Sequence, residues 1–239
     1  MSALALRVLA CVTMLADHIG YCFGFPGLRL VGRISFPIFV FLIYNGYRHT
    51  HHRLRYGLRL ALFALISQIP FGLMSGDSLW YRSGNVMVSL LIAFLCIWLT
   101  DTLYRRAKWL CVLPTMAVFC LYFFGLVRSD YGFKATVMAM LFLLLWDKGL
   151  WGKLLMFPGV AVASFWPYLQ SLALFLLRGG TPPTLSTWEK QQIFAVFSVL
   201  FLCLYNGKKG NVRNKWVQYG FYAFYPVHML LLWAISKFL

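Results

Sequence analysis

The stretch NVMVSLLIAFLCIWLTDTL, residues 85–103, indicates the fold class, because its 19 residues carry one charge, that of Asp101. A helix of this length rises roughly 29 Å at 1.5 Å per residue, which matches the hydrocarbon core of a bilayer. A surface helix of a water-soluble domain repeats polar residues at every turn, and residues 90–99 contain none. The stretch therefore predicts a membrane-spanning helix.

The rest of the chain has the same character. It is 61% hydrophobic and 12% charged, against roughly 45–50% and 25% in soluble domains, and its mean hydropathy is +0.73. These values exclude a soluble or a disordered protein, and long apolar blocks exclude an outer-membrane barrel. We predict an all-α bundle in a single domain, 1–239, with about nine spanning segments: 3–20, 30–46, 57–74, 85–103, 109–127, 132–147, 154–177, 189–205 and 216–236. Eight spans are the alternative, because the sixth segment is short and the seventh contains prolines.

The net charge of +16 comes from 22 Lys and Arg against 6 Asp and Glu. In an apolar chain this excess is typical of cytoplasmic loops rather than of nucleic-acid binding, although part of it could serve an anionic ligand. With the loop 48–55 inside, 14 of the 22 cations lie on that side: Arg7, Arg48, Arg53, Arg55, Arg59, Arg105, Arg106, Lys108, Lys148, Lys153, Lys208, Lys209, Arg213 and Lys215. We therefore expect a multi-pass membrane protein with a cytoplasmic N-terminus. The C-terminus lies outside with nine spans and inside with eight.

Three features are interpreted without a special role. The six cysteines include no CxxC pair and are expected to behave as small buried hydrophobes. The histidines of HTHH, residues 49–52, lack a carboxylate or thiolate companion, so no metal site is predicted. The first apolar segment has no small-residue cleavage site and is interpreted as a spanning helix rather than a signal peptide.

Polar residues inside apolar helices are costly, so each is a functional candidate. Asp17 and His18, in MLADHIG, are adjacent and point about 100° apart on a helix, so they do not pair with each other. We expect Asp17 to meet Arg33 and His18 to face a cavity. The alternative is a polar pair at headgroup level without a function.

The second segment carries polar features of its own. In GRISFPIFVFL, residues 32–42, Arg33 places a charge at the mouth of the helix, and Pro37 is expected to free a backbone carbonyl inside the bundle. The alternative is a kinked helix whose arginine reaches the headgroups. In the third segment, Ser67 and Gln68 lie deep in the membrane, where cross-links between helices are the competing interpretation.

The last segment contains FYAFYPVHMLLL, residues 221–232. Tyr222, Tyr225 and His228 are spaced three apart and so share one helical face. His228 lies roughly 18 Å into the helix, in the same half of the membrane as His18, so the two histidines can meet. A single buried histidine bonded to a tyrosine is the alternative. Asp130, before the sixth segment, is interpreted as ordinary loop chemistry at a helix start.

Several of these motifs together resemble a known family. From about residue 10 to 232 the chain contains, in order, MLADHIG, GRISFPIFVFLIYNGY, RLALFALISQIPF, DYG, YNGKKG and YPVH. This order resembles the TraX family of conjugal-transfer membrane proteins, whose type member is a pilin N-acetyltransferase. The resemblance implies that the protein is located in the bacterial inner membrane. A fainter similarity links the chain to the heparan-α-glucosaminide N-acetyltransferase group, in which a histidine before a segment like SFPIFVF is assigned to catalysis.

The resemblance implies that acetyl moves from acetyl-CoA to an amine, foremost the N-terminal amine of a membrane-inserted pilin, with His18 as the catalytic residue. Histidine suits this role because it exchanges a proton near neutral pH, and both direct transfer and an acetyl-imidazole intermediate remain open. Asp17 and Arg33 are expected to complete the site. The developing oxyanion is assigned to Arg33, a tyrosine hydroxyl or His228.

A basic cytoplasmic face suits the phosphates of acetyl-CoA. The predicted donor contacts are Arg48, Arg53, Arg55, Arg59, Gln68 and Tyr225. Two other kinds of function stay open: a different acceptor, such as a sugar or lipid amine or hydroxyl, and a protein without enzymatic activity. The latter would be a transporter with a proton path through His18 or a scaffold for pilus assembly.

Overall fold

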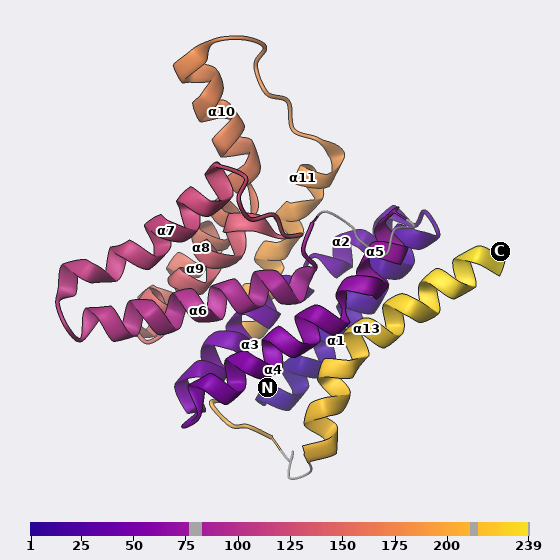
Figure 1. The fold of residues 1–239 in the computed structure, drawn as a ribbon, viewed down its shortest axis with the longest axis horizontal. Coiled ribbons are helices and arrows are strands. Elements are labelled where there is room, and N and C mark those ends of the chain that lie inside the picture. The colour runs from indigo at the N-terminus through magenta and orange to yellow at the C-terminus, as the bar shows by residue number, and fades with distance from the viewer. Residues whose placement is uncertain (77–82, 211–214, 239) are drawn as a thin grey trace.

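The structure is a computed structural model that describes residues 1–76, 83–210 and 215–238. Within these ranges β structure is limited to one isolated bridge, between Gly84 and Ser129. The predicted all-α fold is confirmed (Figure 1). The α-helices are α1 (Ala3–Cys22), α2 (Pro26–Gly32), α3 (Ser35–His49), α4 (Arg53–Ile66), α5 (Gln68–Gly76), α6 (Val86–Tyr104), α7 (Leu113–Phe123), α8 (Gly132–Leu145), α9 (Gly149–Ser164), α10 (Trp166–Arg178), α11 (Thr187–Gln191), α12 (Ser198–Cys203) and α13 (Lys215–Phe238), with 3₁₀ turns η1 (Lys108–Val112) and η2 (Gln192–Phe197).

The helices are those of a membrane protein. In the described part of the chain, four stretches are long and apolar enough to cross a bilayer: Ala3–Cys22, Pro26–His49, Arg53–Gly76 and Val86–Tyr104. Together α9 and α10 would make a fifth, although a bend of 61° separates them. Shorter apolar helices, Lys108–Phe123 and Gly132–Leu145, coincide with the predicted fifth and sixth segments. Nine spans and the orientation of the N-terminus stay predictions.

Prolines explain where two predicted segments are interrupted. A proline lacks the backbone donor, and its ring crowds the carbonyl four residues earlier. Accordingly α4 ends at Ile66, four residues before Pro70, and α9 ends just before Pro167. Pro37 behaves differently from the prediction, because it lies in the first turn of α3. An N–H there has no intrahelical partner to lose, so Pro37 frees no carbonyl within α3, in contrast to the prediction.

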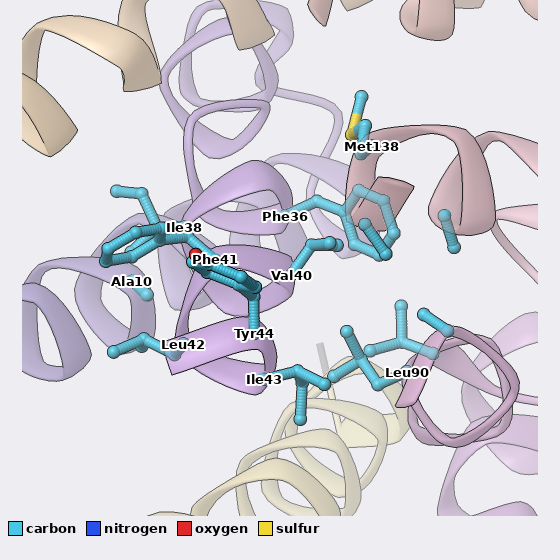
Figure 2. Close-up of a cluster of buried hydrophobic side chains, with 14 of the residues drawn as sticks. Ala10, Phe36, Ile38, Val40, Phe41, Leu42, Ile43, Tyr44, Leu90 and Met138 are labelled. Carbon is cyan, nitrogen blue, oxygen red and sulfur yellow. The ribbon is translucent and has the colours of Figure 1, made fainter. Parts of the chain in front are cut away.

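The helix α3 forms the centre of the bundle, where it contacts α1, α6 and α8. Ile38, Val40 and Phe41 have no exposed surface. Figure 2 shows Ile43 directed toward Leu90 of α6, with side chains of α3 filling the space between the surrounding helices. Because lipid is as apolar as these side chains, close packing rather than removal from water stabilises the arrangement. A rigid α3 in turn positions α1 and α8 around the site.

The two ends of the bundle differ in charge. The N-terminus lies beside the loop after α12, since the Ala3 N–H donates to the Lys208 carbonyl at 2.9 Å and the Asn206 N–H to the Met1 carbonyl at 3.0 Å. We call this the basic end, because it carries Arg48, Arg53, Arg55, Arg105, Lys208 and Lys209. The opposite end, here the distal end, carries α2, α5 and the last turns of α13 (Figure 1). Residues 211–214 of the predicted basic loop 206–215 lie outside the described residues.

Candidate active site

Two histidines that are 210 residues apart in the chain meet toward the distal end. His18 Nδ1 lies 2.6 Å from His228 Nε2, and the two rings are nearly parallel with centroids 4.9 Å apart. His18 comes from α1 and His228 from α13, two helices that pack against each other. His228 is buried, whereas His18 is half-buried. The prediction that the two histidines meet is confirmed.

The hydrogen bonds of His228 determine where His18 carries its proton. His228 Nδ1 lies 2.6 Å from the Phe224 carbonyl oxygen, which can only accept, so this nitrogen is the donor. In a neutral His228 the other nitrogen, Nε2, therefore accepts from the Nδ1–H of His18. His18 is left with an unprotonated Nε2, the atom that a general base uses. An acceptor orients the histidine of a catalytic triad in the same way.

Asp17 binds two guanidinium groups from α2 and the turn after it. Arg33 Nη2 pairs with Asp17 Oδ2, and Arg29 Nε lies 3.8 Å from Oδ1. The prediction that Asp17 meets Arg33 is confirmed. Both residues are buried, at 8% and 3% exposed, and a buried charge that loses its partner is strongly destabilising, so the pair acts as a unit. Gly32 permits this approach, because a Cβ there would lie 2.7 Å from the Asp17 Cα.

These groups line a cavity of about 370 Å³ that we call the distal cavity. Its polar lining includes Asp17, His18, Arg29, Arg33, Asp130 and Tyr225. Polar groups that converge on one cavity are typical of a binding or active site. The structure therefore places His18, Asp17 and Arg33 in one site, with His228 directly behind His18.

Sequence reasoning missed Asp130, which was interpreted as an ordinary residue at a helix start. The residue is exposed to the distal cavity from the loop between α7 and α8. Loss of water around the carboxyl raises its pKa from the ordinary 3.8, while the charges of nearby Lys134 and Arg33 oppose that shift. The signal for this position was its place in the DYG motif, residues 130–132, which the resemblance to a known family included, whereas its place in the cavity depends on contacts between segments distant in the chain.

A second cavity, of about 320 Å³, opens toward the basic end. We call it the basic cavity, because four of its lining residues are cations or histidine: Arg7, His49, Arg59 and Lys209. Tyr56 and Tyr222 are among its aromatic lining residues, and the Arg59 guanidinium carbon lies 5.7 Å from the Tyr56 ring centroid. Cationic groups around an apolar interior suit a ligand with an anionic head and a neutral tail.

The two cavities share part of their walls, formed by Met14, Phe39, Val86 and Tyr225. The predicted face of α13 runs along both. Tyr222 lines the basic cavity, Tyr225 lines both, and His228 contacts His18 in the distal cavity. Six residues of helix separate Tyr222 from His228, a rise of roughly 9 Å. Tyr225 accepts from the Val86 N–H at 3.4 Å, which leaves its hydroxyl proton for another acceptor.

The four predicted arginines separate into two groups. Arg59 lines the basic cavity, whereas the other three line neither cavity. Two of these form ion pairs: Arg48 with Asp147, and Arg53 with Asp101 at 3.6 Å. Arg55 is exposed on the outside of α4. The geometry therefore favours Arg59 as the donor contact among the four.

Gln68 also lies away from both cavities. Its Nε2 donates to the Ser83 carbonyl at 2.9 Å, and its Oε1 accepts from the Asn85 side chain at 3.0 Å. Asn85 in turn caps the start of α6 by accepting from the Met87 N–H. Gln68 thus supports the start of α6, which corresponds to the helix cross-link considered as its alternative role and departs from the predicted donor contact.

The side chains that commonly bind metal ions do not form a metal-binding cluster in the described part of the chain. No group of three or more His, Cys, Asp or Glu side chains among them is placed to hold an ion. All six cysteines are free thiols, with Cys11 and Cys96 buried. His49, from the HTHH motif, instead bonds through Nδ1 to the Asn45 carbonyl at 2.8 Å.

Comparison with known proteins places the chain in a family. Residues 2–236 match the family described as TraX protein. The chain belongs to the TraX family. Over its full length it is also 29% identical to the probable fimbrial assembly protein FimC, serogroup H1, of Dichelobacter nodosus, covering 97% of that protein. No solved structure matches this TraX protein.

Proposed function

We propose that this TraX protein is an integral membrane acetyltransferase of the bacterial inner membrane, which moves acetyl from acetyl-CoA to an amine. The observation that carries the proposal is the His18–His228 pair, which faces a cavity adjoining a second, cationic cavity. The resemblance of the family to the pilin N-acetyltransferase supports the reaction. The relative named as a fimbrial assembly protein supports a pilus-related role, with a membrane-inserted pilin as the acceptor.

The distribution of charge suggests the side from which the donor enters. By the positive-inside rule, the basic end faces the cytoplasm, where acetyl-CoA is found. The anionic nucleotide of the donor then meets Arg7, Arg59 and Lys209 at the basic cavity. The pantetheine arm extends past Tyr222 and Tyr225, so that the thioester reaches His18 in the distal half of the bundle.

The reaction itself requires one base and one oxyanion donor. The acceptor nitrogen attacks the thioester carbonyl carbon, and His18 Nε2 takes a proton from that nitrogen. His228 stabilises the resulting imidazolium through the bond between the two rings. The carbon–sulfur bond then breaks, and the CoA sulfur leaves with the proton from His18. The Tyr225 hydroxyl, whose proton is available, donates to the developing oxyanion.

Binding of the donor tests this proposal. We expect purified protein in detergent to bind CoA and to transfer labelled acetyl from acetyl-CoA to a peptide amine. Arg59→Ala should raise the KM for acetyl-CoA roughly tenfold or more, since a hydrogen bond to a charged group contributes about 1.5–3 kcal/mol. Arg55→Ala, one turn earlier on α4 at an exposed position that lines neither cavity, is the matched control and should change KM little. A protein that binds no CoA would contradict the proposal and favour a scaffold or a transporter.

A further inference from the structure

The distal cavity contains a carboxylate that the proposed reaction does not use. We propose that Asp130 binds the positively charged amino group of the acceptor and so selects an amine over a neutral hydroxyl. This inference rests on the proposed function, because it assigns the acceptor subsite of the same active site. Three observations support it: the ion pairs in the cavity, the backbone hydrogen bonds that hold the loop of Asp130, and the position of His18 in the same cavity.

The charges in the cavity single out Asp130. Of the two aspartates that line it, Asp17 is engaged by Arg33 and Arg29. Asp130 has no ion-pair partner within 4.0 Å among residues 1–76, 83–210 and 215–238, although Lys134 and Arg33 act on it from a longer distance. A carboxylate open to a cavity provides an acceptor for the strong, charge-assisted hydrogen bonds of an ammonium group.

The loop that carries Asp130 is held in place by backbone bonds to the segment before α6. The Asp130 N–H donates to the Gly84 carbonyl at 2.8 Å, and the Gly84 N–H donates to the Arg128 carbonyl at 2.9 Å. Beside it, Ser129 Oγ lies 2.9 Å from Ser89 Oγ. A ligand subsite on such a loop needs little reorganisation, which lowers the cost of binding.

The neighbours of Asp130 connect it to the catalytic pair. Its adjacent residue Tyr131 stacks on Phe36 of α3 with ring centroids 3.4 Å apart, which keeps the loop against the centre of the bundle. The same cavity is lined by His18 and by Tyr225, whose ring centroids are 6.4 Å apart. An ammonium held by Asp130 is therefore in the cavity onto which His18 opens.

The chemistry of the reaction explains why such a subsite is useful. An α-amino group has a pKa of about 7.7–8.0, so the acceptor arrives mostly as an ammonium ion. Conversion of that ion and acetyl-CoA into an amide and free CoA releases one net proton. Asp130 binds the charged form, which loses this net proton to solvent before it attacks. His18 then takes the second proton from the attacking nitrogen and passes it to the CoA sulfur. A neutral hydroxyl gains nothing from the carboxylate.

Peptide binding tests the inference without requiring turnover. The probe is a tripeptide with uncharged side chains, an amidated C-terminus and a free N-terminal amine. It is compared with the same peptide after N-acetylation. At pH 7 the wild-type protein should bind the free amine at least roughly tenfold more tightly. Asp130→Asn should abolish this preference, while Asp130→Glu should retain most of it. Arg128→Gln, on the same loop and outside the cavity lining, should behave like wild type.

A second measurement covers the case in which Asp130→Asn folds poorly. At pH 9.5 the peptide amine is uncharged, so the wild-type preference for it should disappear. A preference that survives in folded Asp130→Asn, or that persists at pH 9.5, would overturn the inference, as would no preference in the wild-type protein. If the preference depends on Asp130 but labelled acetyl is never transferred, the subsite stands and the acetyltransferase proposal fails.

Discussion

Nε2 of His18 is the atom on which the proposed chemistry depends, and His228 keeps its lone pair free. His18 Nδ1 donates a hydrogen bond to His228 Nε2, and His228 Nδ1 donates to the Phe224 carbonyl. Both histidines were predicted from sequence, because helical rise places them in the same half of the bundle. The sequence could not predict which ring nitrogens form these hydrogen bonds. That depends on the ring orientations, which the packing between α1 and α13 determines.

Replacement of His18 should remove the base. We expect His18→Ala to fold and insert but to lose acetyl transfer by about 10²–10⁴-fold if His18 is a general base, with a larger loss if it carries the acetyl group. His228→Ala should cost less, because His228 orients His18 and does not contact the acceptor. The assay is transfer of labelled acetyl to a peptide amine in detergent. A His18→Ala rate equal to that of the wild type would refute the assignment.

The Asp17–Arg33 pair should matter for stability as well as for the site. Asp17→Asn leaves Arg33 charged and buried, so the free energy of unfolding should fall by about 3–5 kcal/mol. The double variant Asp17→Asn, Arg33→Met should lose less than the sum of the two single variants. Asp147→Asn is the control, because its pair with Arg48 is half exposed and contributes about 0–1 kcal/mol. Similar losses for the buried and the exposed pair, measured by denaturation in detergent, would refute this account.

At the scale of the elements, close contact between α1 and α2 brings the guanidinium groups to Asp17. The chain reverses at Gly24, whose φ of 74° favours glycine, and α2 then packs along the end of α1. The apolar pattern predicted the long helices well. The predicted segment 30–46 combined the end of α2 with α3, and the segment 57–74 combined α4 with α5. The apolar pattern alone does not show where a proline or a tight contact interrupts a helix.

Gly32 tests the contact between α1 and α2. A Cβ at this position would lie 2.7 Å from the Asp17 Cα, so α2 must move away. Gly32→Ala should lower the free energy of unfolding by about 1–3 kcal/mol, as overpacked sites do, and should reduce transfer. Gly27→Ala, on the same helix with open space around it, should be neutral or slightly stabilising. Equal thermal stability of the two variants would show that the helices are not in close contact.

At the scale of the whole molecule, two cavities that share part of their walls lie between the basic end and the distal histidines. Composition and hydropathy sufficed to predict a helical membrane bundle, and the spacing of Tyr222, Tyr225 and His228 predicted one face of the path. The DYG motif marked Asp130, but its place in the distal cavity could not be predicted, because it depends on the bridge between Gly84 and Ser129. Arg48 and Arg53 were predicted to contact the donor, because the sequence does not show that each pairs with an aspartate from another part of the chain.

The same charge distribution predicts the orientation of the protein in the membrane. In a background without native cysteines, Phe25→Cys at the distal end should react with a membrane-impermeant maleimide added to intact cells. Lys208→Cys at the basic end should react only after the cells are permeabilised. The positive-inside rule is the physical reason. The reverse labelling pattern would place the basic cavity outside and exclude entry of cytoplasmic acetyl-CoA through it.

The central claim is that acetyl passes through the bundle from the basic end to an acceptor at the distal end. The direct measurement uses proteoliposomes of purified protein with labelled acetyl-CoA trapped inside and a membrane-impermeant peptide amine outside. We predict that label appears on the external peptide with the wild-type protein and is reduced by about 10²-fold or more with His18→Ala. Label that appears only when donor and acceptor share one side of the membrane, or that appears equally with His18→Ala, would contradict the account.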